Sequence, residues 1–225
     1  MPGYSVSKSA RIRLILPVMA TLAILALLPG NAAKLAAMLV VWAIGFGRFS
    51  RAELVLMIGV NLLFLIMNYG ALQKGVFRFS HPDFLGMPVY EFFMWGFYTV
   101  LTIRFLGGET PQGKLWVAIA LAAAFSIPFS TIGDAGMLTL VTAIILIIGL
   151  VLYHEPLDFG YVLFMVTLGA LFEYSGVWSG QWSYPGNPPG GVPLWFITMW
   201  GGIGLFTRRL FLLGVRRGSP SAAAA

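Results

Sequence analysis

Two glutamates lie in segments that otherwise carry almost no charge. Glu91 lies in PVYEFFMW (88–95) and Glu173 lies in LFEYSGVW (171–178). An acid at membrane depth is costly and normally faces the interior of a helix bundle. A protonated carboxyl group in an apolar pocket can donate a proton, so we predict both as catalytic residues. The alternative is structural: a carboxyl group that binds loop backbone near the membrane interface.

Aromatic side chains and one amide lie close to these acids in the sequence. Aromatic rings can wall a pocket and stabilise a cation, and the same residues serve in binding lipid headgroups or sugars. The alternative is a belt of Trp and Tyr at the membrane surface. The predicted substrate-binding residues are Asn68, Phe77, Phe79, Trp95, Trp182, Tyr184, Trp195 and Trp200. His81 and Asp83, in the loop sequence SHPD, are possible accessory residues.

Other kinds of catalytic site have no support in the sequence. The chain has no Cys and two His, and the topology below puts the two His on opposite faces, so we expect no metal site. There is also no Gly-rich phosphate-binding loop with its Lys, and no Ser-centred nucleophile elbow. We therefore expect no cofactor.

The composition predicts the elements that must hold these residues. Of the 225 residues, 59% are hydrophobic and 10% are charged, whereas a soluble domain carries about 25% charged residues. The mean hydropathy is +0.87. Long apolar runs recur along the whole chain, so we predict an all-α, polytopic membrane protein. The net charge of +6 comes from basic residues near the expected helix ends, so we expect no nucleic-acid partner.

Eight apolar segments are each close to the roughly 20 residues that a helix needs to cross a bilayer. An even number of spans puts both termini on one side, where most of the Lys and Arg gather, so we expect both termini in the cytoplasm. We expect the protein in a bacterial inner membrane. At this edge we interpret Glu53, Glu109, Glu155 and Asp158 as solvated helix caps. The predicted spans are 12–29, 33–49, 53–72, 88–106, 114–131, 135–153, 158–178 and 193–213.

A shift of 105 positions, from Gly75 to Gly180, aligns the two halves without a gap. We predict a single domain, 1–225, of two repeats at 1–106 and 107–213 with a tail at 214–225. Four spans in each make the repeats parallel. The shift places Asn68 opposite Glu173 and Phe196 opposite Glu91, so each half keeps one acid, and we expect both acids at one cavity. The other matched pairs are Glu53 with Asp158, Pro88 with Pro193, Trp95 with Trp200, and Arg104 with Arg209.

The second aromatic loop resembles a known family. Its order of Glu173, Gly176, Gly180, Trp182, Tyr184, GVPL (191–194) and Trp200 is similar to that of membrane carotenoid hydratases of the bisanhydrobacterioruberin hydratase type. PVYEFFMW resembles the Pro-x-x-Glu aromatic signature of the heterodimeric-type lycopene cyclases. The resemblance covers roughly 68–106 and 173–213. It departs where the cyclases tend to have paired acids, since Phe92 follows Glu91.

The resemblance implies a small helical membrane enzyme of carotenoid biosynthesis. Glu91 or Glu173 would protonate a polyene double bond, and Trp95, Trp182 and Trp200 would shield the carbocation. Capture of water would make the enzyme a lyase, and internal alkene attack would make it a cyclising isomerase. Neither reaction requires a redox cofactor.

Three functions follow from these observations. The first is acid-initiated hydration or cyclisation of an isoprenoid or carotenoid-like lipid. The second is a non-catalytic membrane subunit that binds a partner protein, pigment or lipid through its aromatic loops. The third is a small-solute transporter, because duplicated folds are common among transporters. The expected partners are a membrane lipid or polyene, and either another membrane protein or a second copy of this chain.

Overall fold

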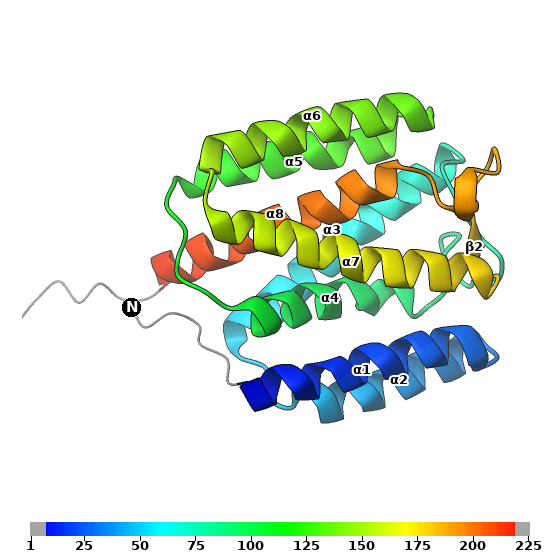
Figure 1. Cartoon of the computed structure of the whole chain (residues 1–225). Coiled ribbons are helices and arrows are strands. Elements are labelled where there is room, and N and C mark those ends of the chain that lie inside the picture. The colour runs from blue at the N-terminus through cyan, green and yellow to red at the C-terminus, as the bar shows by residue number, and fades with distance from the viewer. Residues whose placement is uncertain (1–7, 219–225) are drawn as a thin grey trace, which may run out of the picture.

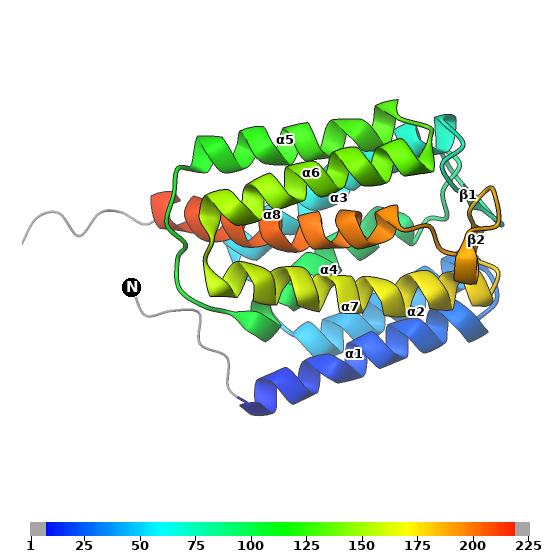
Figure 2. The same cartoon turned by 45° about the horizontal axis from the view of Figure 1, so that its top comes forward.

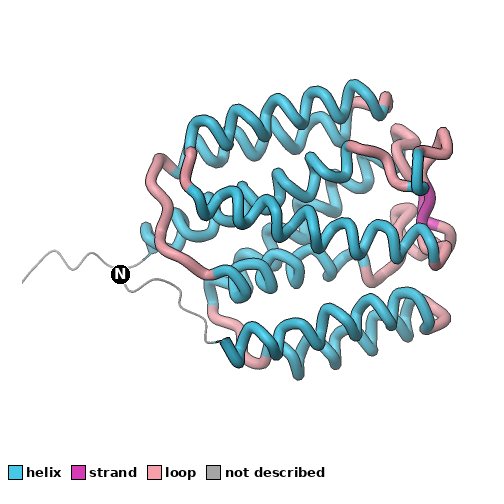
Figure 3. Tube along the Cα trace, viewed as in Figure 1, coloured by secondary structure: helices cyan, strands magenta, loops and turns pink. Residues whose placement is uncertain are grey.

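The chain folds into a bundle of antiparallel helices. A computed structural model describes residues 8–218, with side chains from residue 12 to residue 213. Within residues 8–218 there are eight α-helices, and the prediction of an all-α fold is confirmed (Figure 1, Figure 3). The helices are α1 (Lys8–Leu27), α2 (Asn31–Phe46), α3 (Arg51–Gln73), α4 (Glu91–Leu106), α5 (Leu115–Thr131), α6 (Ala135–Tyr153), α7 (Pro156–Trp178) and α8 (Trp195–Gly218).

Four segments of the described chain are long and apolar enough to cross a membrane. They are α3, α6, α7 and Pro189–Leu213, which contains most of α8. The other apolar helices, Ile12–Leu27, Asn31–Phe46 and Leu115–Thr131, are shorter. An integral membrane protein is therefore supported, and eight complete spans stay a prediction. Of the predicted tail, 214–218 continues α8, and 219–225 lies outside the described residues.

Helix α8 lies at the centre of the bundle and contacts α4, α5, α6 and α7 (Figure 2). In the apolar part of Pro189–Leu213, 89% of the residues are buried, compared with 22% in α6. Glycines permit this central position. A Cβ atom at Gly202 would lie 2.2 Å from the ring of Phe125, and one at Gly204 would lie 2.4 Å from the backbone oxygen of Tyr161. Small residues let helices approach closely inside a membrane.

Ion pairs with buried carboxylates lie at the end of the bundle that holds the start of α1 and the end of α8, here called the terminal end (Figure 1). Arg104 binds Glu53, with 2.6 Å between Nε and Oε1, and Arg209 binds Asp158. Glu53 also completes a capping box with Ser50, as its expected capping role requires. The expected solvation is wrong for Glu53 and Asp158, because both are buried and a buried carboxylate requires a partner.

Two short strands join the long loops at the opposite end, here called the loop end. β1 (Arg78–Phe79) pairs antiparallel with β2 (Trp182–Ser183), so that Arg78 lies opposite Ser183 and Phe79 lies opposite Trp182. The 3-10 helix η1 (Pro189–Gly191) follows in the second loop. The two-stranded β1–β2 sheet therefore holds the loop after α3 against the loop after α7, above the ends of the central helices (Figure 2).

Helices α3 and α7 end in the same local structure. Gly75 and Gly180 follow them with φ of 69° and 71°, a conformation that glycine adopts without a Cβ clash. After α3, the backbone N–H of Gly75 donates to Leu72 and the next N–H donates to Ala71. The corresponding bonds after α7 run from Gly180 to Val177 and from Gln181 to Gly176. Both ends are Schellman caps, which turn each loop back over its helix.

The start of α4 differs from the prediction. The span was expected to begin at Pro88, with Glu91 three residues inside the helix. The helix instead begins at Glu91, and the N–H of Glu91 donates to the carbonyl of Pro88 in a turn that precedes it. Proline therefore ends the loop here instead of opening the helix. As a result, Glu91 lies in the first turn, where the helix dipole favours an acid.

Candidate functional site

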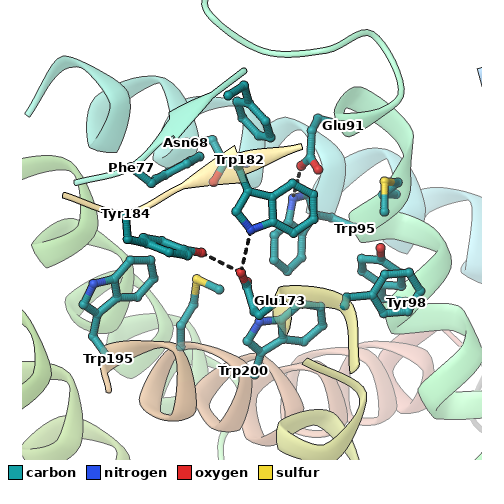
Figure 4. Close-up of a pocket in the computed structure, with 14 residues that line it drawn as sticks. Asn68, Phe77, Glu91, Trp95, Tyr98, Glu173, Trp182, Tyr184, Trp195 and Trp200 are labelled. Atoms are coloured by element: carbon teal, nitrogen blue, oxygen red, sulfur yellow. Dashed lines mark hydrogen bonds between the residues drawn. The ribbon is translucent and has the colours of Figure 1, made fainter. Parts of the chain in front are cut away.

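A small cavity lies between α3, α4, α7 and α8, beneath the two-stranded β1–β2 sheet (Figure 4). Its volume is about 40 Å³. All the residues predicted as catalytic or substrate-binding line it, and the structure brings them together from both halves of the chain. These residues are Asn68, Phe77, Phe79, Glu91, Trp95, Glu173, Trp182, Tyr184, Trp195 and Trp200.

Glu173 has the most complete set of hydrogen bonds in the cavity. Its Oε2 accepts from the indole N–H of Trp182 at 3.1 Å and from the hydroxyl of Tyr184 at 2.5 Å, and its Oε1 accepts from the indole N–H of Trp200 at 3.0 Å. An indole nitrogen only donates, so both carboxyl oxygens serve as acceptors. Figure 4 shows the three donors converging on the carboxyl group. Their convergence fixes its orientation.

Glu91 faces the same cavity from α4 and has fewer partners. Its Oε2 accepts the indole N–H of Trp95 at 3.2 Å, one helical turn further along. Only 9% of Glu91 is exposed. Two of the three tryptophans that donate to the acids, Trp95 and Trp200, are also counterparts under the shift of 105 positions. Each binds a different acid, so the cavity is asymmetric.

Aromatic rings form most of the wall. The ring centroid of Trp200 lies 5.0 Å from that of Trp95 and 5.4 Å from that of Tyr98. The alternative of an interfacial belt fits Trp178, which is 77% exposed, but not the four cavity tryptophans, which are buried. The tryptophans that line the cavity are therefore distinct from the exposed Trp178, which has the position expected of an interfacial belt.

Two glycines on α7 make room for the donors to Glu173. A Cβ atom at Gly169 would lie 2.2 Å from the ring of Trp200. One at Gly176 would lie 2.0 Å from the ring of Trp182. Gly169 had no role in the sequence analysis, and its importance depends on which ring packs against it. Local sequence does not reveal that contact.

Four further residues line the cavity and were missed from the sequence. Helical spacing contained a signal for two of them, because positions three and seven residues after Glu91 lie on its face of a helix. One other precedes Glu173 directly, and the last precedes Trp200. The missed residues are Met94, Tyr98, Phe172 and Met199. Of these, Tyr98 is the one with a polar group, and its buried hydroxyl has no hydrogen-bond partner among the described residues.

His81 and Asp83 do not line the cavity, so their predicted accessory roles are not supported by their positions. Both are exposed in the loop before α4. The carboxylate of Asp83 accepts the backbone N–H of Val89 at 2.9 Å, which closes the loop, and the carbonyl of His81 accepts the side chain of Asn31 at 2.6 Å. These contacts hold the loop in place. Within residues 12–213, no three metal-binding side chains cluster.

A second polar cluster lies at the terminal end, far along α7 and α8 from the cavity. Arg208 binds Asp158 at 2.6 Å and Glu155 at 2.7 Å. Burial alone would raise the pKa of Glu155, but hydrogen bonds from Arg208 and the backbone of Gln112, with the charges of Arg208 and Arg209, lower the pKa below its usual value. This cluster joins α7 to α8 and to the loop after α4, because Arg208 and Arg209 bind Asp158 and Glu155 and Arg209 also donates to the carbonyl of Gln112, and these links suit a structural role.

Two solved structures have a similar fold. One is a mycobacterial Insig homolog, MvINS, from Mycobacterium vanbaalenii, with a TM-score of 0.64 and 14% identity; the match covers 76% of this chain and 97% of that chain. The other is a cross-linked trimer of a cysteine variant of MvINS, with the same TM-score and coverage and 15% identity. No family model and no curated protein matches this sequence. At this identity the likeness establishes a shared membrane-protein fold.

The resemblance to carotenoid hydratases and lycopene cyclases is wrong. The structural neighbours are Insig-like membrane proteins and not members of those families. The residues that carried the resemblance have local explanations. Gly180 is a helix cap, Gly176 makes room for Trp182, and Glu173 is the acceptor of three hydrogen bonds. The pattern therefore reflects how one helix end and one cavity of this chain are packed.

Proposed function

We propose that this chain is a non-catalytic integral membrane protein that binds a membrane lipid, with the polar end of the lipid in the cavity beside Glu173. The Insig-like fold supports this second function of the sequence analysis better than the enzyme. The volume of the cavity also supports it. A site for a whole drug-sized ligand has about 300–1,000 Å³. A cavity of about 40 Å³ suits the end of a ligand whose remainder lies outside.

The hydrogen bonding of Glu173 carries the proposal. An acid catalyst needs its proton directed at the substrate. Both oxygens of Glu173 instead accept hydrogen bonds from Trp182, Tyr184 and Trp200. Removing this carboxyl group from that arrangement would leave three buried donors without acceptors. Such a preorganised acceptor suits binding, because the groups that hold it are already in place before the ligand arrives.

Lipid retention tests the proposal. The chain is purified from membranes in mild detergent, and its bound lipids are extracted and identified by mass spectrometry. We expect one lipid class above the level of a membrane-protein control, chemically unchanged after incubation. In Glu173→Gln, an amide NH₂ faces indole donors that cannot accept it, so retention should fall. Glu109→Gln, an exposed glutamate at the terminal end, is the matched control.

Two results would contradict the proposal. One is a wild-type protein that retains no lipid class above the control, and the other is conversion of the retained lipid to a product. Because Glu173→Gln also disturbs packing, its melting temperature is measured alongside. If the variant unfolds early, Trp200→Phe supplies a second test, since it removes one donor and keeps an aromatic ring beside Gly169.

We also propose that 1–106 and 107–213 are parallel repeats related by a two-fold axis. Helices α3 and α7 start 105 positions apart and end 105 positions apart. Arg78 pairs with its own counterpart, Ser183, which is the arrangement that a two-fold axis produces. The proposal predicts that a break in the loop at 109–113 leaves two fragments that co-purify after co-expression. Failure to associate would show that the boundary is misplaced.

Self-association is a second proposed property. A solved neighbour is described as a cross-linked trimer, and we extend this possibility to the present chain. Native mass spectrometry after gentle release from the membrane should then show more than one copy. Dilution to a monomer without loss of the bound lipid would show that lipid binding does not depend on self-association. This is the expected result, because residues of one chain line the cavity.

A further inference from the structure

Acidic side chains outnumber basic ones in the wall of the cavity. Two of the lining side chains are acids, Glu91 and Glu173, and none of the lining side chains is basic. Lys34 is a basic residue near the start of α2, at the loop end of the bundle. It does not line the cavity, and its ammonium group donates a hydrogen bond to Gln181. Burying a carboxylate is costly unless a counter-charge compensates. A ligand for this cavity is therefore expected to bring positive charge.

The cavity also has fewer hydrogen bonds on the side of α4 than on the side of α7. Trp95 donates to Oε2 of Glu91, and among the described residues no donor is bonded to Oε1. The hydroxyl of Tyr98 is buried without a partner in the same part of the chain. A primary ammonium group has three N–H donors and no acceptor. It can bind the carboxylate and the hydroxyl oxygen together.

The aromatic wall favours the same chemistry. A cation near the face of a Trp or Tyr is attracted by the ring quadrupole, and Trp is the strongest such partner. Trp95, Trp200 and Tyr98 pack against one another around the cavity, with centroid separations of 5.0 Å, 5.4 Å and 5.7 Å. A carboxylate among aromatic rings, without a competing base in the wall, distinguishes this cavity from a site for an anion.

The volume limits the size of the cation. A water molecule needs about 10–15 Å³ by the same measure, so about 40 Å³ holds roughly three water-sized groups. An ammonium nitrogen with its first two carbon atoms has that size. A trimethylammonium group has three methyl groups around one nitrogen, besides the carbon atom that attaches it, and is wider than this.

We infer that the cavity binds a primary ammonium group, through the carboxyl group of Glu91, the hydroxyl of Tyr98 and the surrounding tryptophans. This inference rests on the proposed lipid-binding function and names the chemistry of the bound end. The ammonium group has two potential sources, the headgroup of an aminophospholipid or a free small amine, and the experiment separates them.

Ethylammonium chloride is the probe. The protein is reconstituted in nanodiscs of phosphatidylglycerol, and the probe is titrated while tryptophan fluorescence is followed, with sodium chloride as the control for ionic strength. We expect a saturable change with ethylammonium and a much weaker response to tetramethylammonium. Glu91→Gln should weaken binding at least about tenfold, as expected for loss of a buried charge partner. Tyr98→Phe should weaken it less, and Glu109→Gln should bind like wild type.

A second set of nanodiscs, which contain phosphatidylethanolamine, shows whether the ammonium group comes from a lipid headgroup or from a free amine. If the headgroup occupies the cavity, these discs reduce the response to ethylammonium. If a free amine is the ligand, ethylammonium binds equally in both. Either result supports an ammonium site. Melting temperatures show whether each variant is folded, and Tyr98→Phe, which keeps its ring, remains informative if Glu91→Gln is not.

The inference is overturned if ethylammonium gives no saturable response in phosphatidylglycerol discs, or if Glu91→Gln and Tyr98→Phe both bind it like wild type. A cavity filled by water alone would give the first result. In that case a lipid class that is still retained in a Glu173-dependent manner leaves the proposed function standing. If the protein retains no specific lipid class but still binds ethylammonium, the proposed lipid-binding function is refuted and the ammonium site stands.

Discussion

Replacing Gly169 with alanine tests whether α7 makes room for the indole that holds Glu173. The new Cβ atom would lie 2.2 Å from Cγ of Trp200, whereas carbon atoms in contact lie about 3.5–4.0 Å apart. Trp200 would therefore tilt, either into the cavity or against Trp95 and Tyr98. Either movement breaks the hydrogen bond of 3.0 Å between its indole nitrogen and Oε1 of Glu173.

The size of the effect follows from three contributions. Overpacking a filled interior costs about 1–3 kcal/mol. The lost hydrogen bond costs about 0.5–1.5 kcal/mol. Alanine is a better helix former than glycine by about 1 kcal/mol, which offsets part of the loss. The free energy of unfolding of Gly169→Ala should therefore fall by about 1–3 kcal/mol relative to wild type.

The matched control is Gly59→Ala on α3, where a Cβ atom would meet nothing within 4 Å. This control should be neutral or slightly stabilising, because it changes helix propensity alone. Both variants are unfolded with denaturant in mild detergent, and tryptophan emission is followed. If Gly169→Ala is as stable as Gly59→Ala and its emission spectrum is unchanged, the assignment of Gly169 as the residue that makes room for Trp200 is refuted.

Three further predictions concern the terminal end. Asp158→Asn leaves two buried arginines without their carboxylate, so denaturant titration should show a loss of about 3–5 kcal/mol, and an equal stability of this variant and Glu109→Gln would contradict the buried ion pair. The pKa of Glu155 is lowered in the folded state, so its contribution is present near neutral pH and is lost as the pH falls through that lowered value. The difference in melting temperature between wild type and Glu155→Gln should accordingly shrink on acidification, and a difference that grows would refute the sign. Reporter fusions at both termini should report the cytoplasm, and one inserted at 185–188 should report the other side.

The cavity residues were predictable because acids and tryptophans are conspicuous in an apolar chain. The shift of 105 positions put Trp95 opposite Trp200 and suggested that Glu91 and Glu173 share one cavity, where the structure indeed places both. The sequence did not reveal which side chains donate hydrogen bonds to Glu173. Trp182 lies closer in sequence to Glu173 than Trp200 does, yet both bind it, since the fold of α7 against α8 decides which donors reach the acid.

The remaining differences come from tertiary contacts. Asp158 looked like a surface cap, but Arg208 and Arg209 lie beside it once α7 packs on α8. The start of α4 was predicted at Pro88 but lies at Glu91, because a proline signals a turn before a helix as readily as the first turn within it. The family resemblance failed for a related reason: short patterns of Gly, Pro and aromatic residues arise wherever a helix end is capped beneath an aromatic layer.

The pairing of β1 with β2 has a consequence for biosynthesis. Arg78 and Ser183 meet across 105 positions of chain, and Trp195 and Trp200 follow later still. While the ribosome is completing the second half, Glu91 and Trp95 are already inserted but have no wall opposite them. The cavity is therefore among the last parts of the molecule to form, and a chain that stops before residue 182 has most of its helices but not the complete cavity wall.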